Sequence, residues 1–184
     1  MKNTGTQKLK TERLMLRKIR LTDYFNFHKW YCLAEVSRFS RETGANSKIS
    51  AVIFVLRAVY NYYFKRRKNY YYWAVVKDKR MIGFVGLNET NVKDRFSIYY
   101  MLSPDYQRSG YTKEAVNAVL EYMKTQSCEL LIGACDSENI ASYRVLSDCG
   151  FQWRKRRENY YHYSDGRCGN SEVFVYRFRP KNNN

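Results

Sequence analysis

The feature that most constrains the fold is a β-α-β crossover in the second half of the chain. A strand predicted over 96–102 leads through a proline-containing turn into a helix over 110–124, and a buried strand follows over 130–135. The helix is amphipathic, because its apolar residues share one face: Ala115, Val116, Val119, Leu120 and Met123. A helical crossover joins strands that lie parallel in one sheet. We therefore expect at least one parallel strand pair.

Antiparallel hairpins are predicted on both sides of this crossover. Residues 71–76 and 81–87 form strands around the turn 77–80, and residues 152–161 and 172–178 form strands around the turn 164–167. A first strand contains the apolar residues Leu14, Leu16 and Ile19, with Met15 and Arg17 pointing outward. The sheet is therefore expected to be mixed and mostly antiparallel.

Three further helices complete the prediction. Asp23 caps a helix that runs to about Val36, and Ser47 or Ser50 begins a second that ends at the basic run 65–68. Five apolar residues of the second helix keep helical spacing: Val52, Ile53, Leu56, Val59 and Tyr60. A short helix over 139–146 is stopped by Gly150. The sequence thus predicts one α/β (α+β) domain over 1–184, its core at about 11–178, with about seven strands and about four flanking helices.

The charge is strongly positive. A net charge of +16 attracts polyanions in general, so nucleic acid is a candidate partner. Basic runs at 65–68 and 154–157 are either phosphate-binding patches or solvated loops and strand ends.

Cysteines and apolar runs bear on the compartment. The five cysteines include no CxxC pair, and with two histidines they lack zinc-ligand spacing, so no metal site is expected. The first residues do not resemble a signal peptide, and the most apolar run, 49–60, is too short to span a bilayer. We expect a cytoplasmic protein with free thiols and no membrane contact.

Residues 102–115 carry the strongest chemical signal. A strand ends, a turn with Pro104 follows, and a helix begins around Gly110. The amides and the dipole at a helix N-terminus suit a pyrophosphate, the glycine lets the backbone approach it, and Arg108 adds charge. An ordinary strand-to-helix turn is the alternative.

This segment resembles the acetyl-CoA signature of the GNAT superfamily of acetyltransferases. Gln107-x-x-Gly110-x-Thr112 matches (Arg/Gln)-x-x-Gly-x-(Gly/Ala), although Thr112 departs from the small residue at the last position. Residues 139–151, from Asn139 to Gly150-Phe151, resemble the later motif of the family. Residues 11–17, 82–87 and 160–167 are similar to the ribosomal-protein (alanine) N-acetyltransferase group, so the resemblance covers about 11–178.

The resemblance implies a GNAT-type sheet, splayed between the fourth and fifth predicted strands, 96–102 and 130–135. Acetyl-CoA would lie in this gap. The expected binding residues are Met101, Leu102, Gln107, Arg108, Ser109, Gly110, Tyr111, Thr112, Asn139 and Ser142. Asn139 would hold the pantetheine arm, and a helix cap is its alternative role.

The reaction implied is direct attack of an amine on the thioester, for which a base or water takes the amine proton. The tyrosine acid of many relatives is Leu146 here, so Ser142 is the candidate acid, with packing as its alternative. The glutamate base of related enzymes is Ser97 here, so Glu89 is the candidate base, with an exposed loop carboxylate as its alternative.

The acceptor site is expected between the N-terminal helices, the loop 39–46 and the last hairpin. Glu42, Tyr71, Tyr72 and Tyr161 are the candidate lining residues, and core or surface placement is their alternative. Three functions stay open: acetylation of the α-amine of a protein or peptide, acetylation of a small amine such as an aminoglycoside or polyamine, and a catalytically weak module that binds polyanions. The sequence is compatible with a monomer or a homodimer.

Overall fold

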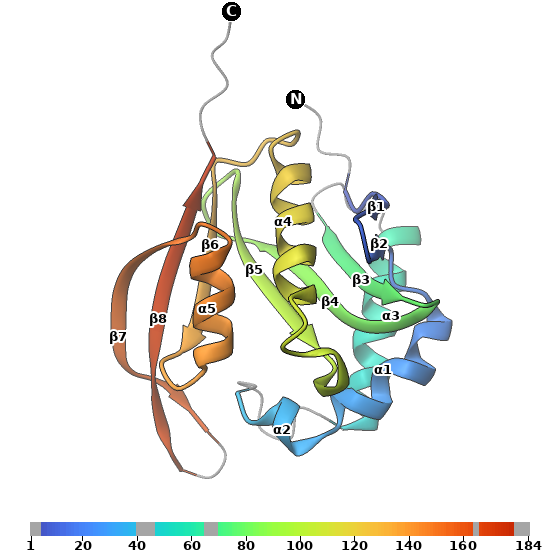
Figure 1. Cartoon of the computed structure of the whole chain (residues 1–184), viewed down its shortest axis with the longest axis horizontal. Coiled ribbons are helices and arrows are strands. Elements are labelled where there is room, and N and C mark those ends of the chain that lie inside the picture. Colours follow the sequence, from blue (N-terminus) through green and yellow to red (C-terminus); the bar gives the residue numbers. More distant parts are fainter. Residues whose placement is uncertain (1–4, 40–46, 65–69, 164–165, 179–184) are drawn as a thin grey trace, which may run out of the picture.

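The computed structural model describes residues 5–39, 47–64, 70–163 and 166–178. One sheet of eight strands runs through them in the order β1-β2-β3-β4-β5-β6-β8-β7 (Figure 1). The strands are β1 (Leu9–Lys10), β2 (Met15–Arg17), β3 (Tyr71–Lys77), β4 (Arg80–Glu89), β5 (Arg95–Leu102), β6 (Leu130–Asp136), β7 (Gln152–His162) and β8 (Cys168–Arg177). Only β5 and β6 pair in parallel, which confirms the predicted crossover and the mixed sheet.

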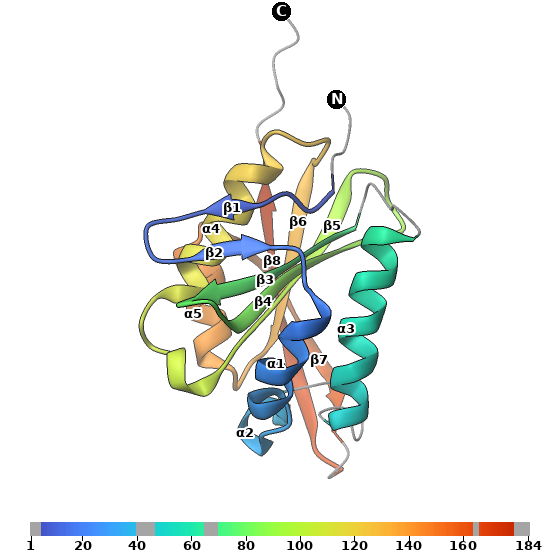
Figure 2. The same ribbon diagram turned by 90° about the vertical axis from the view of Figure 1, so that its right-hand side faces the viewer.

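Helices cover both faces of the sheet (Figure 2). One face carries α4 (Tyr111–Met123) and α5 (Ile140–Asp148). The other carries α1 (Tyr24–Tyr31) and α3 (Lys48–Tyr63), with the short α2 (Ala34–Ser37) beyond α1. Two 3-10 turns, η1 (Leu21–Asp23) and η2 (Pro104–Tyr106), precede α1 and α4.

Each face of the sheet has its own buried core. The larger core packs alternate residues of β3 to β6, such as Trp73 and Phe96, against the apolar stripe of α4 that the sequence predicts. The smaller core packs Phe27 of α1 and Val55 of α3 against Phe84 of β4. Both faces of strands β3 and β4 are therefore buried by helices.

Four details of the segment before α3 differ from the prediction. The eighth strand is β1, a two-residue segment that pairs with β2 and has too little length to show a pattern. The first predicted helix is two helices, because Leu33 adopts an extended conformation (ψ 140°). Arg17 does not point outward, and Asp23 makes no cap bond to α1. Instead the Asp23 carboxylate accepts two 2.7 Å hydrogen bonds from the Arg17 guanidinium.

Ser47, one of the two predicted starting residues, is the N-cap of α3, and its Oγ accepts from the Ser50 N–H at 3.1 Å. Its buried face, however, is Ala51, Val55, Ala58 and Tyr62. The residues chosen from the sequence lie on the other side, where Ile53 is 50% exposed and Leu56 51% exposed. Four of them line an apolar hollow of about 610 Å³ together with Leu21 and Phe64: Ile53, Leu56, Val59 and Tyr60.

No helix in the described parts of the chain is both long and apolar enough to cross a bilayer. The five cysteines are free thiols, as predicted.

Candidate active site

The sheet opens between β5 and β6. The two strands pair only at their start, where residues 95–97 lie beside residues 130–132. Beyond this point β5 continues beside β4 to Leu102, and β6 continues beside β8 to Asp136. The strands diverge toward the end of the sheet at which α4 and α5 begin (Figure 1). The predicted splay is therefore confirmed, and it leaves the inner backbone edges of both strands open.

The side chain of Tyr100 crosses from β5 to α5 at this opening. Its neighbours on the same face, Ile98 and Leu102, belong to the larger core, and its hydroxyl donates to the Ser142 carbonyl oxygen at 3.2 Å. Burial raises the pKa of Tyr100 well above its usual value, and the hydrogen bond with Ser142 lowers it less. Tyr100 is therefore a protonated donor at neutral pH.

The turn after β5 presents the N-terminus of α4. Gly110 caps the helix with φ +78°, a left-handed conformation that favours glycine. The Gln107 side chain donates to the Leu102 carbonyl oxygen at 3.2 Å and so ties the turn to the end of β5. Residues 107–110 are exposed, so the first amides of α4 and the helix dipole face outward. This geometry suits an anion, with Arg108 as the adjacent cation.

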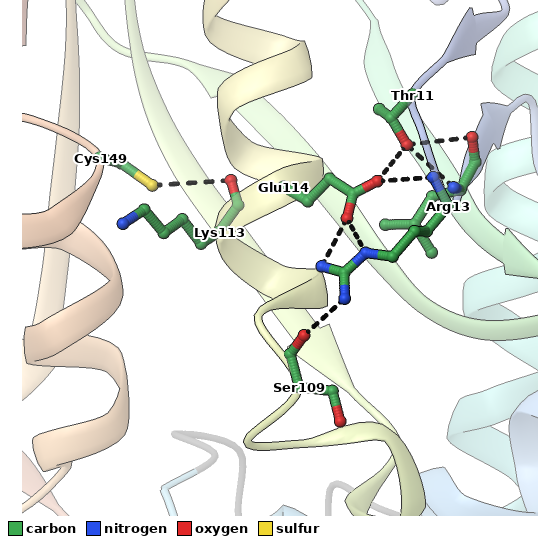
Figure 3. A network of polar contacts seen from close by, with 7 residues as sticks. Thr11, Arg13, Ser109, Lys113, Glu114 and Cys149 are labelled. Carbon is green, nitrogen blue, oxygen red and sulfur yellow. Dashed lines mark hydrogen bonds and ion pairs between the residues drawn. The ribbon is translucent and has the colours of Figure 1, made fainter.

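A distant arginine holds this turn in place (Figure 3). The Arg13 guanidinium bonds the Glu114 carboxylate of α4 at 2.7 Å and the Ser109 carbonyl oxygen at 3.0 Å. Glu114 also accepts from Thr11 and from the Arg13 backbone N–H. Burial raises the pKa of Glu114, but these hydrogen bonds outweigh it, and the net pKa is lowered. The β1–β2 segment therefore fixes the start of α4.

Asn139 is the N-cap of α5. Its Oδ1 accepts from the Ser142 N–H at 3.0 Å, so the capping role weighed from the sequence is present. Only the acceptor oxygen of the amide is used in this bond, so the amide nitrogen can still donate to a group in the gap. The two helix N-termini, of α4 and α5, thus flank the same opening.

The opposite face of the opening is partly uncovered. Ser97, Tyr99 and Met101 alternate onto the α1–α3 side of β5, and Ala134 lies on this side of β6. Tyr99 is 45% exposed although β5 is an inner strand. Glu138 borders this face, with Arg38 at 3.7 Å and Arg167 at 3.8 Å. A second molecule can therefore reach the opening from this side.

The candidate base and the acceptor-site residues lie in different places. Glu89 pairs with Phe96, on the face of the larger core, and its charge acts on the buried Tyr71. That is the side opposite Ser97 and Tyr99, which argues against Glu89 as the base.

Tyr71 is fully buried in the larger core and does not line a site, contrary to the prediction. Tyr161 is 7% exposed, with Ser171 Oγ 3.4 Å from its hydroxyl, and is also largely enclosed. Tyr72 is half-buried and donates to Asn88 Oδ1 at 2.7 Å, on the Ser97 side of the sheet. Glu42 lies outside the described residues.

Three features of the site were not predicted from the sequence. Tyr100 belongs to neither of the two sequence motifs. Only its position in the strand beside the opening indicates that it has a role. Arg13 and Glu114 are 101 positions apart. Asp136 ends β6 on the uncovered face, 4% exposed, and accepts from the Tyr163 hydroxyl and from the Glu138 N–H. Within the described ranges, no cluster of His, Cys, Asp or Glu side chains is arranged to hold a metal.

Comparisons with known proteins agree with this geometry. A family model described as the acetyltransferase (GNAT) domain matches residues 13–152. The uncharacterized N-acetyltransferase YnaD of Bacillus subtilis (strain 168) is 27% identical over 153 residues, which are 82% of this chain and 84% of that protein.

Two solved structures show the same fold. The ribosomal-protein-S5-alanine acetyltransferase of Vibrio fischeri superposes with a TM-score of 0.79 at 19% identity, covering 93% of this chain and 96% of that one. RimJ of Mycobacterium smegmatis, in complex with CoA-disulfide, gives 0.81 at 16% identity, covering 96% and 90%. With the family match spanning most of its length, the chain belongs to the GNAT family and is an acetyltransferase whose acetyl donor is acetyl-CoA.

Proposed function

We propose that this chain is a single-domain cytoplasmic enzyme that acetylates the N-terminal α-amine of a protein or peptide by direct attack in a ternary complex. The observation that carries this proposal is the opening between β5 and β6, flanked by the N-termini of α4 and α5 and reachable from the α1–α3 face.

The residues around the opening fit acetyl-CoA, which supplies the thioester when bound. The amides of 108–112 and the Arg108 guanidinium receive the phosphates, since residues 108–110 are exposed around the left-handed Gly110. The backbone of Met101 and Leu102 and the amide nitrogen of Asn139 bind the pantetheine arm. Thr112 is half-buried in the first turn of α4.

Tyr100, rather than Ser142, is proposed to donate the proton to the departing thiolate. Its hydroxyl is protonated at neutral pH and lies beside α5, where Leu146 replaces the tyrosine of many relatives. The Ser142 carbonyl oxygen holds the hydroxyl in place before the donor binds, so Ser142 is a positioning residue.

The absence of a glutamate at Ser97 favours an α-amine as acceptor. An α-amine has a pKa of about 7.7–8.0, so roughly a quarter is neutral at pH 7.4, against about 0.1% of a lysine amine. An α-amine therefore loses its proton to water without a strong base. The Vibrio fischeri relative is named for an alanine of a ribosomal protein, which fits the same class.

The acceptor class is tested with two matched peptides and release of the CoA thiol as the readout. One peptide has a free α-amine and an acetylated lysine, and the other has an acetylated N-terminus and a free lysine. We expect the first to react at least tenfold faster near pH 7.4. Faster reaction of the lysine peptide would show that a lysine amine is the acceptor. Faster reaction of an aminoglycoside or polyamine would show that a small amine is the acceptor. A melting temperature that acetyl-CoA does not change would favour the third function, a catalytically weak module that binds polyanions.

Tyr100 is tested as Tyr100→Phe, with acetyl-CoA binding followed by thermal shift. We expect unchanged binding and a fall in kcat of about 10²-fold. A thioester whose leaving thiol has a lower pKa should restore most of the rate, because such a thiolate leaves without protonation. An equal loss with both thioesters would show that Tyr100 acts only in packing.

A further inference from the structure

Strand β7 forms one edge of the sheet and carries the densest basic run among the described residues (Figure 1). Arg154, Lys155, Arg156 and Arg157 follow one another, and every residue from 152 to 160 is exposed. The strand lies two positions from the opening, beyond β6 and β8. The acetyl-transfer site therefore does not account for these charges.

One of the four cations is already neutralised. Arg156 bonds the carboxylate of Glu172 at 2.7 Å, and Glu172 is 3% exposed and also accepts from the Trp153 indole N–H. This pair is a structural element of the hairpin, because it satisfies a buried carboxylate.

The other three cations are not neutralised within the described residues. Arg154 bonds only the neutral Gln152 side chain, at 2.8 Å. Lys155 forms no ion pair with any described residue. The Arg157 guanidinium lies over the Tyr160 ring, 4.9 Å from its centroid. Glu158 is the one acid of the strand. A local charge of about +2 therefore faces outward on the edge strand.

The pairing of β7 with β8 is irregular at two places. Trp153 pairs with Phe174 and Lys155 with Val173, so Arg154 is an extra residue. Farther along, residues 158–160 face the single residue Asn170, whose side chain accepts from the Asn159 N–H at 2.9 Å. At the two ends of the run, Trp153 is 51% exposed and Tyr160 is 39% exposed. Trp153 lies on the face of the sheet that carries α5, because its partner Phe174 belongs to the larger core, whereas Lys155 and Arg157 pair with Val173 and Ser171 on the opposite face. The exposed rings and cations are therefore distributed along both sides of the edge strand.

We propose that β7 binds single-stranded nucleic acid, with its phosphates on Arg154, Lys155 and Arg157 and its bases stacked on Trp153 and Tyr160. Cations that follow a backbone and rings that stack on unpaired bases are the two elements of sequence-tolerant single-strand binding. A lipid surface fits less well, because an interfacial element inserts a continuous apolar face and β7 exposes only these two rings.

The test measures anisotropy of a labelled single-stranded RNA of about 12 nucleotides with the full chain at several salt concentrations. The variant Arg154→Gln/Lys155→Gln/Arg157→Gln is compared with a charge-matched control, Lys8→Gln/Lys10→Gln/Lys93→Gln, whose three lysines are exposed elsewhere. We expect the β7 variant to reduce the slope of log K against log salt by about 2, because each single-strand phosphate contact contributes about 0.7. The control should leave the slope nearly unchanged.

Tyr160→Leu provides a second test, since it keeps every charge. We expect it to weaken single-strand binding at least fivefold without changing the salt slope, because stacking on one ring is lost. The same acetyl-CoA thermal shift in all variants verifies folding and separates this proposal from the proposed enzymatic function.

Several results would overturn the proposal. Equal loss of slope in the β7 variant and in the control would mean that binding follows the diffuse net charge. Binding of a duplex as tightly as the single strand would remove the stacking argument. No binding at low salt, or binding only to vesicles of anionic lipid, would rule out the nucleic-acid site.

Discussion

Replacing Gly110 by alanine tests the backbone geometry on which the donor site depends. Gly110 has φ +78°, and a Cβ there would lie 3.5 Å from Arg13 Nη2, an ordinary contact. The cost is therefore that of the left-handed conformation alone, about 1–2 kcal/mol. For a chain of 184 residues this lowers Tm by roughly 2–8 °C. Relief of that strain turns the first amides of α4, so we also expect weaker binding of acetyl-CoA.

Gly166 supplies the matched control for this experiment. Its φ is +83° and no atom of the described residues lies within 4 Å of a Cβ built there, so Gly166→Ala carries the same backbone cost in the turn between β7 and β8 and not at the start of α4. Both variants are followed by thermal melting, with and without acetyl-CoA, where a ligand at about 100 times Kd adds about 2.7 kcal/mol. An unchanged Tm for Gly110→Ala would refute the left-handed cap. Equal loss of the acetyl-CoA shift in both variants would refute the placement of the phosphate site. Gly110→Asn should lose less stability than Gly110→Ala, because asparagine tolerates this conformation.

Three further predictions concern stability and reactivity. Glu114→Gln should cost about 1.5–3 kcal/mol at pH 7 through its charged hydrogen bonds. Because the pKa of Glu114 is lowered in the folded chain, this stabilisation is present above the unfolded pKa of about 4.3 and is lost as the pH falls through the folded pKa. If denaturant melts gave the same difference in stability between the original chain and Glu114→Gln at pH 7 and at pH 3, this prediction would be contradicted. Val55→Ala should cost about 1.5–3 kcal/mol and Leu56→Ala under about 0.5 kcal/mol, and the reverse order in urea melts would show that the other face of α3 is buried. Burial raises the pKa of the Cys149 thiol to about 11, so iodoacetamide at pH 8 should label the exposed Cys168 first; mass spectrometry that finds Cys149 labelled in the folded chain would contradict this.

The sequence alone determined those features whose signals are local. The apolar stripe of α4 and the two apolar segments around it predict the crossover, because a period of 3.6 or 2 is visible within a dozen residues. Ser47 begins α3 and Asn139 begins α5, because a capping side chain acts on amides only three residues away. The turn around Gly110 was also predicted from a local signal.

Only the tertiary structure decided which surfaces meet. Helix α3 is apolar on several sides, so its period did not indicate that Val55 would be buried and Leu56 exposed. The face to which Glu89 and Tyr71 belong depended on strand register, where a shift of one residue exchanges the two faces of a strand. The bond from Arg13 to Glu114 and the reach of Tyr100 to Ser142 join residues far apart in the chain. Such pairs form when packing brings their elements together, and no periodicity within either segment specifies the partner.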